Sequence, residues 1–287
     1  MLFNQEKLYK NVIGVFFAGR KLQVARIENG VLTCIIDKEV NNRETEEYII
    51  NEIIVAIEQV MITDIYAIGI GVPSLVDVKK GIVYKAANVP SWRKVHIKDI
   101  LENRFQLPVF VNNDANCFAI GEKHFGIARE YEHIAGITLG AGFGVGIIIN
   151  SRLYSGNNCG AGEFSSIPYK HHDYEYYCST AFFDEKYGIS FKAWLQRANK
   201  NDKVAIAVFE QYGYELGNAL KAIMYAIDPQ AIIIGGQISE AYEYFKDAMF
   251  ENVQTFIYPN TIENIKILKS EEPNIATYGA AALCFDY

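Results

Sequence analysis

The chain has little of what a protein needs to bind DNA or a membrane. Its 27 Lys and Arg residues are outnumbered by 34 Asp and Glu residues, the net charge is −7, and no basic run is longer than two residues. Binding to duplex DNA or to an anionic membrane surface needs a basic face that neutralises phosphates. No stretch reaches the roughly 18 apolar residues of a membrane-spanning helix. We therefore expect neither nucleic acid nor a membrane as a partner.

Cysteine is also scarce. The five cysteines are spread widely, are odd in number and form no CxxC pair. This pattern is typical of reduced thiols rather than of a disulfide framework. The first ten residues, MLFNQEKLYK, lack the apolar core of a signal peptide and leave no room for a helix-turn-helix module. We expect a cytoplasmic protein without a DNA-binding domain.

The patterns that are present predict an α/β fold. Residues 12–40 predict three antiparallel strands, with Asn29-Gly30 as a hairpin turn, because both residues tolerate positive φ. Apolar residues at helical spacing predict a helix over residues 44–60, and a buried strand follows at 64–73. Further elements are expected as helices at 97–105, 117–126, 203–227 and 276–285, strands at 108–114 and 231–236, and a loop at 169–177.

The opening pattern returns at residues 134–156, where a strand, a glycine-rich turn and two more strands are predicted. Gly19 and Gly142 then fall in corresponding turns, which indicates an internal duplication. Two copies predict a two-lobed fold with a cleft. The expected bounds are 1–116 for the N-terminal lobe, with the helix at 275–287 packing back on it, and 117–274 for the C-terminal lobe.

Two acidic positions suit sugar chemistry. Asp114 follows a predicted strand, where it could accept a proton from a substrate hydroxyl while Asn113 binds a neighbouring hydroxyl. The alternative is that Asp114 is the N-cap of the next helix. Glu163 follows a glycine turn and could accept hydrogen bonds from two adjacent hydroxyls, the alternative being a solvated loop glutamate.

Two glycine clusters suit a nucleotide. Gly140, Gly142 and Gly144 alternate along a hairpin turn, where backbone N–H groups can form an anion-binding nest, although glycines there also serve a purely structural turn. Gly235 and Gly236 follow an apolar strand and would let an adenine or a helix approach the backbone. The alternative is a plain strand-to-helix turn.

Six segments in this order resemble the ROK family of bacterial sugar kinases and sugar-responsive repressors, which has the hexokinase/actin-like fold. They are GIGVPSLVD, AANVPSW, VNNDANCFAIGE, ITLGAGFGVGIIIN, GAGEF and DPQAIIIGGQIS. The resemblance implies a duplicated actin-like fold, a homodimer, ATP and Mg²⁺ as cofactors, and a hexose or N-acetylhexosamine as ligand.

The resemblance also implies roles for particular residues. Asp114 matches the base that deprotonates the sugar 6-hydroxyl. Sugar-binding positions are matched by Asn88, Asn113, Asp114 and Glu163, and nucleotide-binding positions by Gly19, Gly140, Ala141, Gly142, Gly144, Gly235 and Gly236.

Several family positions are altered. Phe16 stands where the family has the aspartate that organises Mg²⁺, Arg20 replaces a threonine, and Ala141 replaces a threonine of the second phosphate loop. Because phosphoryl transfer depends on metal and positioning, these losses should raise its barrier. Ser166 replaces a histidine and Thr180 a sugar-binding glutamate.

The family's zinc motif keeps a single cysteine, Cys178. A structural zinc needs four ligands, so we expect no structural zinc and no other metal site. A rebuilt site from His171, His172, Asp173 and Cys178 would fit no standard spacing, and a solvated loop is the favoured interpretation.

Three functions remain to be weighed. The sugar side of the site keeps more of the family's groups than the phosphate side. We therefore expect a sugar-binding protein with weakened or absent ATP-dependent phosphorylation of the 6-hydroxyl. The alternatives are an active, glucokinase-like hexose kinase and a non-catalytic sugar sensor. A repressor that binds DNA is disfavoured by the short N-terminal segment.

Overall fold

The computed structural model describes residues 10–86 and 88–285. Their contacts group them into two compact units. The first comprises the described residues of Met1–Glu130, Gly146–Ala161 and Glu271–Tyr287, and the second comprises Tyr131–Val145 and Gly162–Ser270. The lobe bounds expected above, with a change after residue 116, remain a prediction.

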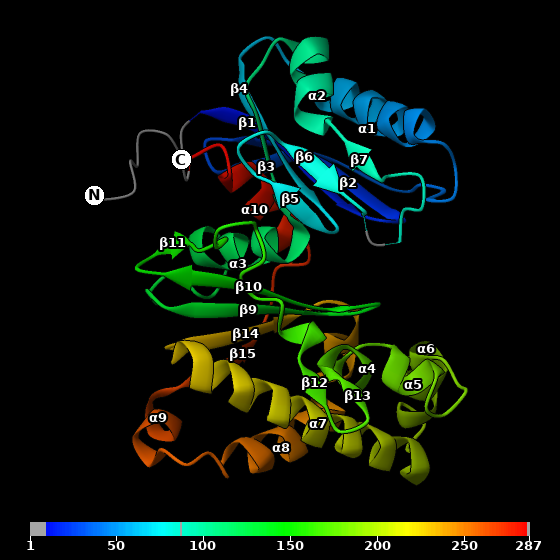
Figure 1. Cartoon of the computed structure of the whole chain (residues 1–287), viewed down its shortest axis with the longest axis vertical. Helices are drawn as coiled ribbons and strands as arrows, with labels where there is room; N and C mark the ends of the chain where they lie inside the picture. Colours follow the sequence, from blue (N-terminus) through cyan, green and yellow to red (C-terminus); the bar gives the residue numbers. More distant parts are fainter. Residues whose placement is uncertain (1–9, 87, 286–287) are drawn as a thin grey trace. The chain divides into compact units, whose positions relative to one another are not determined.

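The first unit is built on a five-stranded sheet of order β3-β2-β1-β4-β8 (Figure 1). The first three strands are antiparallel neighbours, and β4 and β8 run parallel to β1. At the first turn Asn29 and Gly30 both have positive φ, as the hairpin prediction requires. The strands are β1 (Asn11–Ala18), β2 (Lys21–Glu28), β3 (Val31–Glu39), β4 (Ile65–Val72) and β8 (Val109–Asn113).

Helices pack on the two faces of this sheet. The larger core lies against α1 (Glu46–Val60) and α2 (Ile97–Phe105), and α1 begins at the N-cap Thr45. The other face contacts α10 (Ile275–Ala282), which packs closely on α3 (Asp114–His124). A small separate sheet joins β5 (Leu75–Asp77), β6 (Ile82–Tyr84) and β7 (Lys94–Val95).

A second five-stranded sheet has the order β11-β10-β9-β14-β15. Its strands are β9 (Ile134–Leu139), β10 (Phe143–Ile149), β11 (Arg152–Leu153), β14 (Ala231–Gly235) and β15 (Lys266–Lys269). In both sheets three strands that follow one another along the chain are joined by two later parallel strands, in the same spatial order. The predicted duplication is therefore confirmed at the level of topology.

The rest of the second unit consists of helices and one short hairpin. The long helix α7 (Lys203–Ile227) matches its predicted bounds and packs on α8 (Tyr242–Val253). Its other elements are β12 (Pro168–Tyr169), β13 (His172–Asp173), α4 (Tyr174–Cys178), α5 (Ala181–Asp184), α6 (Phe191–Ala198) and α9 (Pro259–Asn264), with short 3-10 turns η2 (Phe164–Ser166) and η3 (Gln237–Ala241). Among the described residues no helix has the length and apolar character needed to cross a bilayer.

The expectation of a loop at residues 169–177 is wrong. Pro168–Tyr169 and His172–Asp173 pair as a short antiparallel hairpin, and Tyr174–Cys178 form α4. Asp173 caps the helix, because its side chain accepts a hydrogen bond from the backbone N–H of Tyr176 over 2.9 Å. These elements are too short to produce a hydrophobic period.

The packing of α10 on β4 yields a stability prediction. A Cβ on Gly69 would overlap the backbone of Ala280, so Gly69→Ala should lower the free energy of unfolding of the first unit by about 2 kcal/mol or more. Urea unfolding can be followed by the fluorescence of Trp92 in a Trp194→Phe background. Gly160→Ala is the control, because its Cβ would meet only Leu75 at an ordinary 3.9 Å. Equal stability of the two variants would contradict this account of the packing.

Candidate functional site

In the first unit, the candidate site is built at the carboxyl ends of three parallel strands. Pairing places Phe16 of β1 beside Gly71 of β4, and Gly71 beside Asn112 of β8. Phe16 stands where the family has its metal-organising carboxylate. Through Gly71 it therefore lies in register with Asn112, the residue before Asn113. Carboxyl ends of parallel strands are where α/β proteins place ligand groups.

Asn113, not Asp114, is the N-cap of α3. Its Oδ1 accepts hydrogen bonds from the N–H groups of Ala115 over 2.8 Å and of Asn116 over 3.3 Å. Its Nδ2 donates to the carbonyl of Ser74 over 3.2 Å. The helix therefore begins at Asp114, three residues earlier than predicted. Asn113 thus holds the start of the helix with both lone pairs of its Oδ1 and one hydrogen of its Nδ2, and the second Nδ2 hydrogen remains for another acceptor.

Asp114 is the first residue of α3 and is half-buried. One of its carboxylate oxygens accepts a hydrogen bond from the N–H of Ala115 over 2.9 Å. A carboxylate in the first helical turn lies near the positive end of the helix dipole and is held in place there. Because Asn113 is the N-cap, the alternative in which Asp114 caps the helix is excluded. The role of Asp114 as a base remains a prediction.

Asn88 and Gly19 lie together in the same unit. A Cβ on Gly19 would be 3.4 Å from the Cβ of Asn88, and the carbonyl of Asn88 accepts a hydrogen bond from Nδ2 of Asn42 over 2.6 Å. Asn88 is exposed and has a φ of 60°, a conformation that asparagine tolerates better than most residues. The structure therefore brings the expected sugar-side asparagine next to the first phosphate loop.

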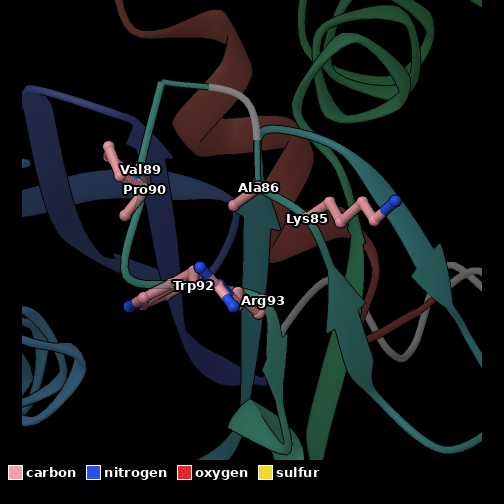
Figure 2. A pocket seen from close by; sticks show the side chains of 6 residues that line it. All are labelled: Lys85, Ala86, Val89, Pro90, Trp92 and Arg93. Atoms are coloured by element: carbon pink, nitrogen blue, oxygen red, sulfur yellow. The ribbon is translucent and has the colours of Figure 1, made fainter.

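A pocket of about 400 Å³ lies beside this segment (Figure 2). Its floor is apolar, since Ala86, Val89 and Trp92 are buried, and Trp92 packs on Phe17 with ring centroids 5.3 Å apart. In Figure 2 the side chain of Lys85 extends away from that of Trp92. The pocket is lined by Lys85, Ala86, Val89, Pro90, Trp92 and Arg93.

Residues that the sequence analysis did not single out support this half of the site. Ser74 has a φ of 127°, and its hydroxyl donates to the carbonyls of Tyr84 over 2.5 Å and of Lys85 over 3.0 Å. It thereby ties the segment that leads to Asn88 to the strand that bears Asn113. Proline followed by serine directly after a buried strand is the one signal that could have drawn attention to it.

A buried polar cluster fixes the loop that follows β11. Nδ2 of Asn116 donates to Oδ1 of Asn112 over 2.9 Å, and the Cys159 thiol donates to the same oxygen over 3.3 Å. Asn112 and Asn116 are each only 1% exposed, so these contacts replace lost water contacts. Asn112 lies in β8 and Asn116 in the first turn of α3, so their contact spans the strand-to-helix junction. Two asparagines four residues apart were visible in the sequence, but that spacing alone does not predict such a contact.

The metal-organising position does not fit Mg²⁺. Phe16 has no oxygen to offer, and Arg20 is exposed and pairs with Glu39 over 3.3 Å instead of facing a phosphate position. Within residues 10–86 and 88–285, no group of three or more His, Cys, Asp or Glu side chains is arranged to hold a metal ion. No step that depends on Mg²⁺ can be derived from these residues.

In the second unit, both glycine motifs meet at one sheet edge. A Cβ on Gly236 would overlap the backbone of Leu139, the residue that precedes Gly140, and Gly235 pairs with Thr138. Gly236 has a φ of 85°, so glycine is required there for both conformation and contact. The expected adenosine and phosphate motifs are therefore neighbours. Gly140, Ala141 and Gly142 form the turn, whereas Gly144 lies within β10.

Glu163 is placed by a glycine contact in the same unit. Gly162 has a φ of 94°, and a Cβ there would overlap the carbonyl of Val145. The Glu163 residue is exposed to solvent overall, yet partial burial raises the pKa of its carboxyl. Its charge acts on Glu175, whose pKa is raised mainly by burial and further by Asp173 and Glu163.

The residues at the family's zinc positions do not fit a zinc ion. Cys178 is fully buried, and burial raises the pKa of its thiol well above the ordinary value, which favours the protonated form. Asp173 is committed to capping α4, and the ring of His172 stacks on Tyr176 at 3.9 Å. Zinc binds the thiolate, so this arrangement opposes it.

An ion pair and stacked rings hold this segment instead. Glu215 of α7 is 2% exposed and accepts hydrogen bonds from Lys170 over 2.6 Å and from the Tyr169 hydroxyl over 3.0 Å. The ring of Tyr169 stacks on Tyr174 at 4.6 Å. The β12–β13 hairpin is thus fixed to α7 through side chains.

The comparisons with known proteins agree with this architecture. The model of the ROK family matches residues 13–286. A xylose repressor from Bacillus spizizenii is 28% identical over 218 residues, covering 71% of this chain, and the chain spans only 56% of that repressor. A glucokinase from Thermotoga maritima is 28% identical over 235 residues, covering 71% of this chain and 74% of the glucokinase.

A solved structure gives the same result. The ROK family glucokinase from Streptomyces griseus, in complex with glucose and AMPPNP, superposes with a TM-score of 0.82 at 28% identity, covering 95% of this chain and 98% of that one. The expected two-lobed α/β fold is confirmed.

The Lys170–Glu215 pair yields a stability prediction. Lys170→Ala leaves a buried carboxylate without its cation, so the second unit should lose about 2–3 kcal/mol of unfolding free energy. The combined variant Lys170→Met with Glu215→Leu should recover most of that loss. Urea unfolding of the second unit can be followed by Trp194 in a Trp92→Phe background. Additive losses in the double variant would contradict a mutual ion pair.

The raised pKa of Glu175 yields a pH prediction. The folded state binds this proton more tightly than the unfolded chain, so the stability it contributes is present at low pH and is lost as pH rises above about 4.5. Glu175→Gln should therefore make the decline of unfolding free energy between pH 4.5 and neutrality shallower. Urea unfolding at a series of pH values measures it. Glu185→Gln, at an exposed position of the same unit, is the control, and parallel curves for Glu175→Gln and wild type would refute the prediction.

Proposed function

Because the chain belongs to the ROK family, we propose that it binds a hexose or an N-acetylhexosamine and phosphorylates the 6-hydroxyl weakly or not at all. The observation that carries the proposal is the difference between two neighbouring positions of the first unit. At the end of β8, hydrogen bonds of Asn113 hold the start of the helix that carries Asp114. At the position in register on β1, Phe16 replaces the family's metal-organising carboxylate.

We assign sugar binding to Asn88, Asn113 and Asp114 in the first unit and to Glu163 in the second. Asp114 accepts the hydrogen of the sugar hydroxyl, since an ionised carboxylate is an acceptor only. Asn113 uses its remaining amide hydrogen to donate to a neighbouring hydroxyl.

An active hexose kinase is the second candidate. It is favoured by the position of Asp114 and by the similarity to glucokinases. It is opposed by Phe16 and by Ala141, because both removed groups would have contacted Mg²⁺ or phosphate. A cytoplasmic location and a homodimer, both expected from the sequence, are further proposals.

Calorimetry tests the proposal directly. Glucose, N-acetylglucosamine, N-acetylmannosamine and fructose are titrated into the full chain, and at least one should bind. ADP release with Mg²⁺-ATP should stay far below the roughly 1–100 per second of ordinary kinases.

Asp114→Asn should abolish any residual phosphorylation and change sugar affinity by less than about tenfold. Asp99→Asn, at an exposed position of α2, is the control for a lost negative charge. Sugar-dependent ADP release at ordinary rates would support the active kinase instead.

A further inference from the structure

The glycine turn that should cradle phosphate already holds an anion from its own chain. The N–H of Phe143, at the end of the turn, donates a hydrogen bond to Oε2 of Glu175 over 2.9 Å. A Cβ on Gly142 would lie 3.2 Å from Oε1 and 3.5 Å from Oε2 of the same side chain. Both oxygens of the carboxylate therefore lie against the backbone of the turn.

The helix that carries Glu175 is fixed at both ends. Asp173 caps α4 at its start, and after its end the N–H of Thr180 donates to the carbonyl of Gly140 over 2.8 Å. Tyr174, beside Glu175, is buried and stacks on Tyr169. The carboxylate reaches the turn from a rigid support, and the helix is itself bonded to that turn.

The surroundings of the turn are acidic. Glu163 and Asp173 both act on Glu175 and add to the effect of burial in raising its pKa. A nucleotide phosphate would have to displace the carboxylate from the Phe143 N–H and would also face these like charges. Like charges brought together in a partly buried site disfavour binding. The loss of a hydroxyl at Ala141 leaves the backbone as the main source of donors.

We propose that Glu175 occupies the phosphate place on the Gly140–Phe143 turn and so excludes nucleotide polyphosphates from it. The turn offers the N–H of Phe143 to an anion, and the anion that accepts it is intramolecular. Glu175 is a specificity-determining residue that separates sugar binding from phosphate binding. This inference rests on the proposed function, because it gives a reason why a protein with a sugar-kinase fold would bind a sugar without turning over ATP.

The test compares anion binding by the full-length wild type and three variants. AMPPNP with Mg²⁺ and inorganic pyrophosphate are titrated by calorimetry into wild type, Glu175→Gln, Glu175→Ala and Glu185→Gln. Glu185 is exposed in the same unit, so its variant loses the same charge without touching the turn. Both Glu175 variants should bind both probes at least about tenfold more tightly than wild type, with Glu175→Ala the tighter, because it also frees the N–H of Phe143.

Either of two results would overturn the inference. One is equal affinity for the probes in all four proteins, or an equal gain in Glu185→Gln. The other is Mg²⁺-dependent binding by wild type that Glu175→Gln abolishes, which would make Glu175 a metal carrier rather than a barrier.

A second measurement needs no variant. In wild type labelled with ¹⁵N-phenylalanine, the amide resonance of Phe143 should stay in place when AMPPNP is added, because Glu175 retains the hydrogen bond. A shift of that resonance at saturation would show that phosphate replaces the carboxylate. A sugar titration of the same sample tests the proposed function separately. If no sugar binds, the proposed function is refuted, whereas the role of Glu175 is decided only by the titrations with AMPPNP and pyrophosphate.

Discussion

Backbone contact between α10 and the first sheet is the constraint on which the first unit depends. Gly14 and Gly69 have no side chain, so the backbone of α10 lies directly on β1 and β4. Gly121 and Gly279 allow α3 and α10 to approach equally closely. The contact holds α3 against α10, and Asp114 is the first residue of α3, directly after β8. These glycines thus help to place Asp114 without contributing a side chain of their own.

In the second unit, the segment after Glu163 is held by side-chain contacts. Its family members hold the segment after Glu163 with a metal, according to the resemblance, whereas this chain holds it with a buried ion pair and stacked tyrosines. A buried carboxylate such as Glu215 is costly unless its hydrogen bonds are complete, and here Lys170, Tyr169 and Gln211 all donate to it. These contacts fix the hairpin to α7, and α4, which follows the hairpin, carries Glu175 to the glycine turn.

The regular elements could be predicted from the sequence because their periodicity is local. The Asn29-Gly30 turn, the isoleucine face of α1 and the length of α7 all follow from patterns within one element. The segment Tyr174–Cys178 could not be predicted, because five residues contain little more than one helical turn. The alternative that Asp114 caps the helix is wrong. Asn113 and Asp114 both suit an N-cap by residue type, and only the hydrogen bonds that the Asn113 Oδ1 accepts from Ala115 and Asn116 decide between them. Glu175 has no local signal at all, because its partner is 32 residues away.

Glycines at a turn establish that the backbone can approach an anion, and they do not establish which anion. At the Gly140–Phe143 turn the donor is supplied by the backbone, so any carboxylate or phosphate of suitable reach can satisfy it. An intramolecular carboxylate has a large advantage, because it loses no translational freedom on binding. A phosphate competes only if it brings further contacts, and the side chain of Ala141 offers no hydroxyl for one. An uncharged hydroxyl faces no such competition, because it brings no charge against Glu163 or Glu175. The general consequence is that a carboxylate from the same chain can occupy a glycine turn and thereby make that turn selective against phosphate while leaving neutral ligands unaffected.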